Sequence, residues 1–508
     1  MIRKYPIGIQ HFREMREEGY LYVDKTKIIH QLVETGKYYF LSRPRRFGKS
    51  LLVDTLAELF SGSNELFKGL WIYDHWDFEK INPVIRFSFS NIGVTTNGIE
   101  AALFGALQDN AIRLGISLTK PSIDLQFREL IEKAAKKGNV VILIDEYDKP
   151  IIDFIDKPEV MVENRSIMKS FYSILKDSGN HIRLLLITGV SQFSHVSIFF
   201  DLNNLDNITL STQNGAVVGI TQAELDHYFA VEIRELQKKQ PDILSQIKDW
   251  YNGYTWNLKD WVYNPFSLLK FMKDPVFKNY WYTTGTPTFL IKLLKNRKIY
   301  DVENIRIGES ALSMFEPEDP SISSVLFQTG YLTIKKIINN GNLYELGYPN
   351  KEVKISLLEG LLSGYREVRA GESTEIVSFI KSSLKNKDIP GLINQLNLLI
   401  ASIPYDHWNA DTESIFNIIT FLAFKIAGMD VQTEIHSSKG RCDLRVMTDS
   451  LIYVIELKLD GAAEEALQQI MAKGYLEPYM TDTREKLAVG ISFSSAKRKV
   501  AEYLIQEL

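Results

Sequence analysis

The sequence predicts an α/β protein with a parallel sheet in its N-terminal part, a helical extension, and a smaller α/β domain at the C-terminus. Two patterns carry this prediction. Residues 139–144 form a continuous apolar run, which is typical of a strand buried on both faces in a parallel sheet. Residues 411–493 show patterns in the order helix, three strands, helix, strand, which indicates a second sheet with its own helices.

Length and composition favour a globular chain with several domains. The chain has 508 residues, 45% of them hydrophobic, and is long enough for about two to four domains. The 59 basic and 63 acidic residues give a net charge of -4, so any contact with nucleic acid needs a local basic patch. The single cysteine, Cys442, excludes an internal disulfide and suits a reducing compartment.

No segment indicates export or membrane insertion. Basic residues at the N-terminus are not followed by an apolar stretch of signal-peptide length. The most apolar helical pattern, residues 415–428, is interrupted by Asn417 and Lys425 and is too short to cross a bilayer. We therefore expect a soluble, cytoplasmic protein with no membrane partner.

A strand, a loop and a helix follow one another in residues 37–60 and indicate a phosphate-binding site of the P-loop type. In a loop of the form G-x-x-x-x-G-K-[ST], backbone N–H groups at a helix N-terminus bind phosphate. The lysine reaches the β- and γ-phosphates and the hydroxyl binds Mg²⁺. We expect ATP to be bound by Arg46, Phe47, Gly48, Lys49 and Ser50, the last of these also holding Mg²⁺.

Two carboxylates after the apolar run support this site. Arg43 stands where the pattern has its first glycine, so Gly-Lys-Ser alone could be a chance tripeptide before an ordinary helix. Asp145 and Glu146 follow residues 139–144 directly, at the end of a strand that would lie beside the loop. Although such residues also cap helices, we expect Asp145 to hold Mg²⁺ and Glu146 to orient the attacking water.

A polar residue at the end of the next buried strand could sense the γ-phosphate. Residues 182–187 form that strand, Thr188 is the candidate and Ser191 the reserve. The alternative is an ordinary strand end. An arginine supplied in trans cannot be identified from one sequence.

The middle of the chain is predicted to form a helical lid followed by a helix–hairpin–helix unit. Thr221 and Glu224 fit a capping box, and helical stretches continue to about residue 294. Between residues 321 and 365, two helices flank a hairpin with an Asn340-Gly341 turn, which suggests a winged-helix module. Such a module could contact nucleic acid or transmit the nucleotide state, or it could serve packing alone.

A second site is predicted in the C-terminal domain. Glu456 and Lys458 lie two residues apart on a strand and therefore share a face, toward the neighbouring strand with Asp443. Asp443 and Glu456 offer hard oxygen ligands for Mg²⁺, and Lys458 could orient a water and stabilise charge on a phosphate. Glu413, on the preceding helix, could add a ligand. The order of elements and these residues resemble a PD-(D/E)XK nuclease core.

Burial distinguishes this site from ordinary surface charges. The apolar neighbours of Glu456 make its strand central, where unpaired charges are costly unless they bind a metal or each other. The basic run 497–499 could contact a phosphate backbone, although such a run is more often a solvated helix face.

The chain resembles a known family. Residues 8–12, 22–26 and 43–50 are similar to the AAA-ATPase-like family of bacterial proteins that carry a PD-(D/E)XK nuclease-like domain at the C-terminus. The resemblance implies that Arg43 is a family variant of the loop, and that Gln469 and Tyr475 are secondary site residues. It also implies that Gly440-Arg441-Cys442 before Asp443 replaces the proline of the nuclease motif, which supplies no ligand.

We therefore expect an ATPase domain in residues 1–220, a helical lid and winged-helix region in 221–365, and a nuclease-like domain in 366–508. The leading hypothesis is an ATP-controlled, Mg²⁺-dependent phosphodiesterase with DNA or RNA as partner. The alternatives are a nucleotide-driven signalling or assembly switch whose C-terminal domain binds without cleaving, and a nucleotide-binding protein with little turnover. A homo-oligomer is allowed but not indicated.

Overall fold

The computed structural model describes residues 3–192, 202, 204–281, 288–312, 321–338, 342–369, 371–404, 412–437 and 440–508. The chain forms two compact units. Unit 1 comprises Met1–Gly285 and Val302–Val353, and unit 2 comprises Thr286–Asp301 and Lys354–Leu508. The three-part division expected from the sequence stays a prediction.

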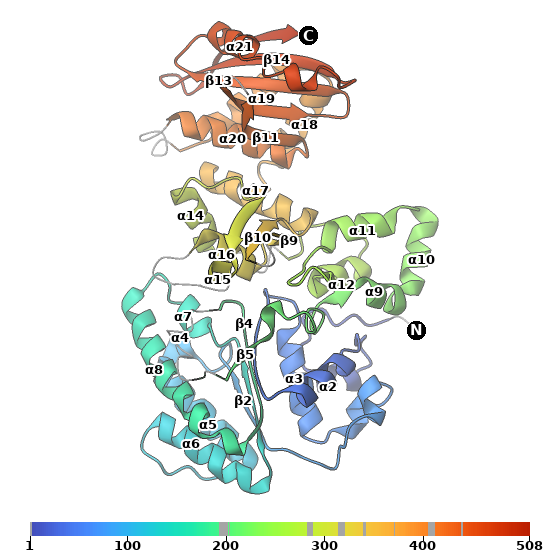
Figure 1. Ribbon diagram of the computed structural model, residues 1–508, viewed down its shortest axis with the longest axis vertical. Helices are drawn as coiled ribbons and strands as arrows, with labels where there is room; N and C mark the ends of the chain where they lie inside the picture. Colours follow the sequence, from blue (N-terminus) through green and yellow to red (C-terminus); the bar gives the residue numbers. More distant parts are fainter. Residues whose placement is uncertain are drawn as a thin grey trace. The chain divides into compact units, whose positions relative to one another are not determined.

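The N-terminal sheet is parallel and has five strands in the order β2-β3-β4-β1-β5 (Figure 1). Its strands are β1 (Tyr38–Ser42), β2 (Val84–Ser88), β3 (Val140–Asp145), β4 (Ile182–Gly189) and β5 (Asp206–Asn207). All residues of β3 are buried, as its unbroken apolar sequence predicts. Because only β4 separates β3 from β1, the predicted loop and the predicted carboxylates meet at the same edge of the sheet.

Helices cover both faces of this sheet. Figure 1 shows α5, α6 and α8 on one face and α2 and α3 on the other. The helices are α1 (Phe12–Glu17), α2 (Thr26–Thr35), α3 (Lys49–Phe60), α4 (Val94–Asn97), α5 (Ile99–Leu114), α6 (Ile123–Ala134), α7 (Lys149–Ile152) and α8 (Pro158–Asp177). Short 3-10 turns are η1 (Asn64–Phe67), η2 (Trp71–Asp74), η3 (Ala135–Lys137), η4 (Gly179–His181) and η5 (Ile208–Leu210).

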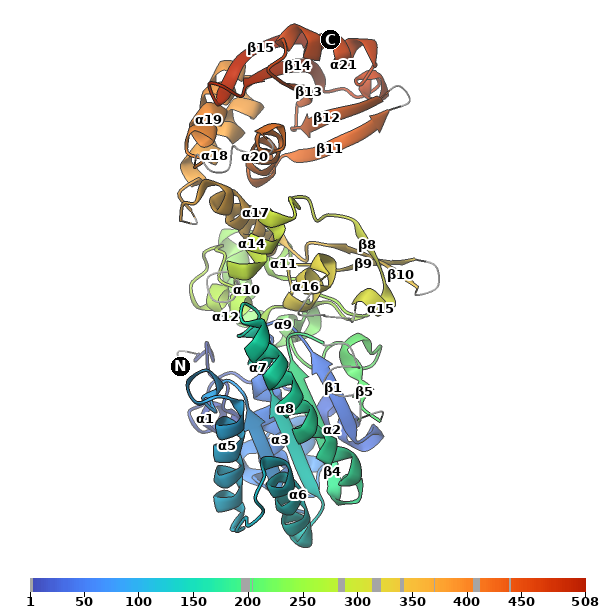
Figure 2. The same cartoon turned by 90° about the vertical axis from the view of Figure 1, so that its left-hand side faces the viewer.

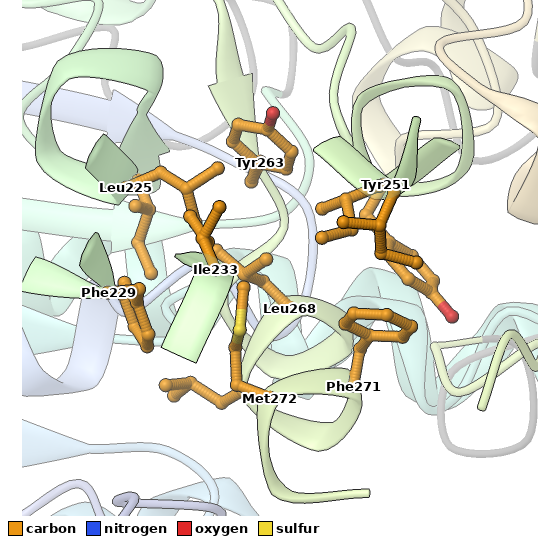
Figure 3. Close-up of a cluster of buried hydrophobic side chains, with 12 residues drawn as sticks. Leu225, Phe229, Ile233, Tyr251, Tyr263, Leu268, Phe271 and Met272 are labelled. Carbon is orange, nitrogen blue, oxygen red and sulfur yellow. The ribbon is translucent and has the colours of Figure 1, made fainter. Parts of the chain in front are cut away.

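The predicted helical lid has its own hydrophobic core. Its elements are β6 (Ile220–Thr221), α9 (Gln222–Tyr228), α10 (Ala230–Lys239), α11 (Ile243–Tyr251), β7 (Val262–Tyr263) and α12 (Pro265–Lys273). The capping box predicted at Thr221 and Glu224 is present at the start of α9. Figure 3 shows side chains such as Phe229 and Leu268 turned toward one another in this core. Tyr5 and Val23, from the N-terminal segment, pack against it.

The rest of unit 1 contains the predicted helix and hairpin with one more strand. The elements are β8 (Ile305–Gly308), α15 (Glu309–Leu312), α16 (Ile322–Thr329), β9 (Thr333–Ile338) and β10 (Leu343–Gly347), and α17 (Lys351–Arg366) follows. The strands form an antiparallel sheet in the order β8-β10-β9. The predicted turn at Asn340-Gly341 lies outside the described residues.

Unit 2 contains a mixed five-stranded sheet in the order β11-β12-β13-β14-β15. Its remaining elements are α14 (Thr288–Asn296), α18 (Thr374–Lys385), α19 (Ile389–Ala401), α20 (Thr412–Ile426), β11 (Asp430–Ser437), β12 (Gly440–Met447), β13 (Leu451–Leu459), α21 (Ala463–Ala472), η8 (Glu477–Tyr479), β14 (Glu485–Ser494) and β15 (Lys499–Glu507). Figures 1 and 2 show α21 on one face of this sheet and α18, α19 and α20 on the other. Among the described strands of this sheet, only β13 and β14 pair in parallel.

The fold class predicted from the sequence is confirmed: an α/β protein with a parallel N-terminal sheet and a second sheet in the C-terminal region. One local interpretation is wrong. The basic run 497–499 is not a helix face, because Lys497 and Arg498 form a turn and Lys499 begins β15. Arg498 has a left-handed φ of 48°, which ends any helical path there. Within the described ranges, no helix is both long and apolar enough to cross a membrane.

Candidate functional site

The first candidate site is the loop between β1 and α3. Two of its residues have left-handed backbones, Arg46 with φ 69° and Gly48 with φ 96°. Gly48 caps α3, and a Cβ built on it would meet no atom within 4 Å, so the loop leaves open space before the helix N-terminus. Arg43 is not among the left-handed residues, so the loop turns without a glycine at that position.

Arg43 anchors the loop from behind. Its side chain is fully buried, and Nη1 donates to the carbonyl oxygens of Ser42 at 2.8 Å and Thr209 at 2.9 Å. The guanidinium carbon lies 4.0 Å from the ring centre of Trp256, a cation–π contact. Burial lowers the pKa of Arg43 to about 9. The sequence located this residue but not its role, because two of its partners, Thr209 and Trp256, lie more than 160 residues away.

Phe47 is also anchored below the loop. Its ring is buried and lies 4.8 Å from that of Tyr254 and 5.6 Å from that of Trp256, measured between ring centres. Its carbonyl accepts a hydrogen bond of 3.1 Å from the main-chain N–H of Gly219. The ring therefore belongs to the support of the loop, while the main chain of Phe47 remains part of it.

Lys49 is held ready at the start of α3. Its Nζ donates to the carbonyl oxygens of Arg43 at 2.9 Å and Pro44 at 3.0 Å. Burial lowers its pKa, and the charges of Asp145 and Glu146 act in the opposite direction. The charged amine of Lys49 is therefore bound only by neutral carbonyl oxygens in this pair of hydrogen bonds, and a phosphate can replace them.

Two carboxylates at and after the end of β3 are hydrogen-bonded to the end of β4 and the residues that follow it. Thr188 Oγ1 donates to Asp145 Oδ1 at 2.6 Å, so the predicted sensor contacts the predicted metal ligand directly. Asp148 is buried and accepts main-chain hydrogen bonds from Val190 at 3.0 Å and Ser191 at 2.7 Å. Burial raises the pKa of Asp148 to about 6. Asp148 was not predicted from the sequence, although it belongs to the acidic cluster that follows the strand.

A cleft of about 420 Å³ opens in front of the loop. This volume lies in the range of small-molecule sites. Gly48, Lys49, Ser50 and Glu146 line it, together with N-terminal residues 6–10. A smaller cavity of about 90 Å³ adjoins it, with mainly apolar walls that include Leu51 and several residues of the lid. Of these N-terminal residues, 8–10 belong to the family resemblance, but the sequence predicted no place for them in a site.

The second candidate site is built on β12 and β13. Glu456 Oε1 accepts hydrogen bonds from Lys458 Nζ at 3.3 Å and from Gln469 Nε2. Lys458 Nζ also donates to Gln469 Oε1 at 2.7 Å. Asp443 Oδ2 accepts from the main-chain N–H of Leu457 at 2.8 Å, so the two strands hold both carboxylates together.

Burial gives this group unusual electrostatics. Glu456 is 2% exposed, and desolvation raises its pKa to about 7, with a further rise from the charge of Asp443. Lys458 opposes that rise. Gln469 lies on α21 and Tyr475 just after it, and Gln469 Nε2 lies 3.5 Å from the Tyr475 hydroxyl.

The oxygen donors of both sites suit Mg²⁺, which takes one or two carboxylates and completes its shell with water. The second site offers Asp443 and Glu456, while the first offers Asp145 and the hydroxyl of Ser50. Glu413 lies in the first turn of α20, but its side chain falls outside the described residues. Among the residues that are described, no group of three or more His, Cys, Asp or Glu gathers to hold a metal.

Comparison with known proteins matches both regions. Residues 6–199 match a family described as predicted AAA-ATPase, and residues 411–503 match the PD-(D/E)XK nuclease superfamily. A protein of Azotobacter chroococcum mcd 1, described as an uncharacterized protein in the vnfD 5' region, is 40% identical over 521 residues. That alignment covers 100% of this chain and 99% of the relative. No solved structure matches. The first matched range contains the phosphate loop and the second contains Asp443, Glu456 and Lys458.

Proposed function

The chain belongs to the AAA-ATPase-like family and carries a PD-(D/E)XK nuclease superfamily domain, and from this we propose that it is an ATP-controlled, Mg²⁺-dependent phosphodiesterase acting on DNA or RNA. The observation that carries the proposal is the buried Glu456, which is hydrogen-bonded to the partly exposed Lys458 and Gln469 and lies beside Asp443. Burying this carboxyl group is costly for stability alone, and the group as a whole has the chemistry of phosphodiester cleavage.

At the first site, the loop binds the phosphates of ATP. Lys49 exchanges its two carbonyl partners for phosphate oxygens, and the N–H groups at the start of α3 bind the same anion. Ser50 and Asp145 would hold Mg²⁺, and Glu146, which lines the cleft, orients the attacking water. The adjoining apolar cavity accommodates the base of the nucleotide.

Thr188 connects hydrolysis to the rest of the sheet. Its hydroxyl donates to Asp145, so a change in the coordination of Asp145 alters this hydrogen bond. Asp148 then fixes the main chain of the next residues, Val190 and Ser191. We assign Thr188 the role of sensor and Asp148 that of a positioning residue.

At the second site, Asp443 and Glu456 would hold Mg²⁺, which supplies a water of lowered pKa and a positive charge for the phosphate. Lys458 orients that water and stabilises the charge that grows on the phosphate oxygens. Gln469 keeps Lys458 on the same face as Glu456. Glu413 stays a candidate for a further ligand.

Coupling between the two activities is supported by the path of the chain. α17 is one continuous helix, and Val353 and Lys354, which follow one another in it, belong to different units. Glu352, one residue earlier, is buried in unit 1 and accepts a hydrogen bond of 2.7 Å from the main-chain N–H of Trp281. A change of nucleotide state in unit 1 can therefore reach unit 2 along a regular helix.

The direct test is cleavage of labelled single- and double-stranded DNA and RNA with Mg²⁺ or Mn²⁺. Wild-type protein should cut at least one substrate, and Lys458→Ala should not. Lys473→Ala, which removes a lysine at the end of α21, is the matched control and should cut like wild type. If no substrate is cut while ATP is hydrolysed, the nuclease assignment is wrong and the second site becomes a binding site of a nucleotide-driven switch.

A further inference from the structure

Four cations line the cleft in front of the phosphate loop: Arg45, Arg46, Lys49 and Lys149. Three of them already have partners. Lys49 is bound to carbonyl oxygens of the loop, and Lys149 Nζ lies 2.7 Å from Asp153 Oδ2. The guanidinium of Arg46 lies 5.0 Å from the ring centre of Phe266.

Arg45 differs from these three. Its side chain is exposed, and in the part of the chain that the structure describes its guanidinium forms no ion pair, hydrogen bond or ring contact. The charge of Arg45 nevertheless acts on Lys49: burial is the main cause of the lowered pKa of Lys49, and Arg45 lowers it further. Arg45 is therefore near the phosphate-binding lysine, with its own donors available.

The main chain of Arg45 is fixed, in contrast to its side chain. Trp281 Nε1 donates to the Arg45 carbonyl oxygen at 3.2 Å. Trp281 is 1% exposed, and its main-chain N–H is bound to Glu352. The preceding residue, Pro44, packs against Gly330 so closely that a Cβ on Gly330 would lie 2.7 Å from its ring. The main chain of Arg45 is thus held by a buried side chain and a closely packed neighbour at the rim of the cleft.

We propose that Arg45 is a phosphate-binding residue that contacts the terminal phosphate of the nucleotide beside Lys49, and that Trp281 positions it. This inference rests on the proposed function of the same site and adds the residue that distinguishes a nucleoside triphosphate from a diphosphate.

The chemistry favours the terminal phosphate. An arginine presents several N–H donors in one plane, which matches two oxygens of a phosphate, whereas a lysine acts as a single charged point. Placing the anion between Arg45 and Lys49 also removes the repulsion between the two cations. The γ-phosphate carries the most charge and needs the most donors. Arg45 would supply the additional cation from the same chain, in place of an arginine supplied in trans.

The test compares binding of Mg²⁺ complexes of AMP-PNP, a non-hydrolysable triphosphate, and of ADP, both by titration calorimetry on the full-length protein. Arg45→Gln should weaken AMP-PNP binding about tenfold or more and ADP binding less than about threefold. Arg45→Lys should recover part of the affinity for AMP-PNP. Lys149→Gln, with the same loss of charge in the same cleft, should weaken both ligands less than about threefold because its lysine is already paired.

Trp281→Phe tests the positioning role, because it keeps an aromatic ring and deletes the N–H donor. It should weaken AMP-PNP binding about threefold in wild type and cause no further loss in Arg45→Gln. A purely structural role of Trp281 would weaken binding equally in both backgrounds.

The outcomes distinguish failure of the proposed function from failure of the role assigned to Arg45. If wild type binds neither nucleotide, the proposed function is wrong, and Arg45 loses its role with it. If wild type binds both and Arg45→Gln weakens AMP-PNP and ADP equally, or Arg46→Gln alone produces the selective loss, only the assignment of Arg45 is overturned.

Discussion

The two candidate sites treat their charges in opposite ways. At the phosphate loop, Lys49 donates to neutral carbonyl oxygens, and the guanidinium of Arg45 has no partner among the described residues, so positive charge remains available in an open cleft. On β13, Lys458 and Glu456 bind each other and share Gln469. The side chains of Lys458 and Glu456 are therefore paired before any ligand binds.

This difference indicates which ligand each site needs. A cleft with unneutralised cations favours a polyanion, and its donors lose little when phosphate replaces a carbonyl. A closed group of acid and base does not attract a phosphate by itself. With a pKa of about 7, Glu456 is also reluctant to ionise next to Asp443, and a divalent cation relieves that cost. We therefore expect the second site to bind a metal ion before the phosphodiester.

The largest effect is expected from Lys49→Ala, which removes the cation proposed to bind phosphate. ATP hydrolysis should fall about 100- to 1000-fold, measured by phosphate release. Lys37→Ala is the matched control, because Lys37 Nζ also donates to a carbonyl oxygen, that of Gly179, but does not line the cleft. Equal activity in wild type and Lys49→Ala would show that Lys49 is not needed to bind the phosphates of ATP.

The second prediction concerns metal binding at the acidic site. Glu456→Gln keeps the shape of the side chain but removes its charge, so the affinity for Mn²⁺ without nucleotide should fall about 100-fold. Calorimetry measures this, with Glu464→Gln on α21 as a control for loss of a nearby surface charge. An unchanged affinity would mean that these carboxylates do not hold the metal.

The third prediction tests the support behind the phosphate loop. Gly330 and Gly115 both end helices with left-handed φ, 90° and 66°, but only Gly330 lies against Pro44. Gly330→Ala should cost about 2–3 kcal/mol of unfolding free energy, the sum of backbone strain and overpacking, whereas Gly115→Ala should cost about 1 kcal/mol. Denaturant titration checks both, and Mn²⁺ binding at the second site should not change. Equal costs would show that the contact with Pro44 is loose.

The smallest effect is expected at Glu352, a buried carboxyl group whose pKa is raised although it belongs to neither candidate site. Burial raises the pKa of Glu352 from 4.5 to about 7, as it does for Glu456, yet Glu352 binds main-chain and hydroxyl donors in the core. Because its folded pKa is raised, its contribution to stability is complete below about pH 4.5 and declines until about pH 7. Glu352→Gln should therefore be more stable than wild type by about 1–2 kcal/mol at pH 8 and not at pH 4.5. Thermal unfolding at both values measures the difference, and a constant difference would contradict the raised pKa.

Much of each site was predictable from sequence because its residues are tied to local patterns. Lys49 follows a strand and starts a helix, Asp145 ends a buried strand, and Glu456 and Lys458 alternate on another. Strand order then brought Thr188 to Asp145, as expected for neighbouring parallel strands.

The remaining features depend on contacts between distant segments, which no local pattern encodes. The hydrogen bond from Trp281 to Arg45 joins residues 236 positions apart, and that from Arg43 to Thr209 joins residues 166 positions apart. β15 was missed because it forms the exposed edge of its sheet, where a mixed polar sequence gives no alternation of buried and exposed positions.

The central claim is that the nucleotide site controls the nuclease site. It is tested most directly by comparing cleavage of the preferred nucleic acid by wild type and Lys49→Ala, with and without ATP, at saturating Mn²⁺. We predict that ATP changes the cleavage rate of wild type at least about fivefold and leaves that of Lys49→Ala unchanged, while both proteins bind Mn²⁺ equally. Identical cleavage by both proteins, whether or not ATP is present, would contradict the account and leave two independent sites on one chain.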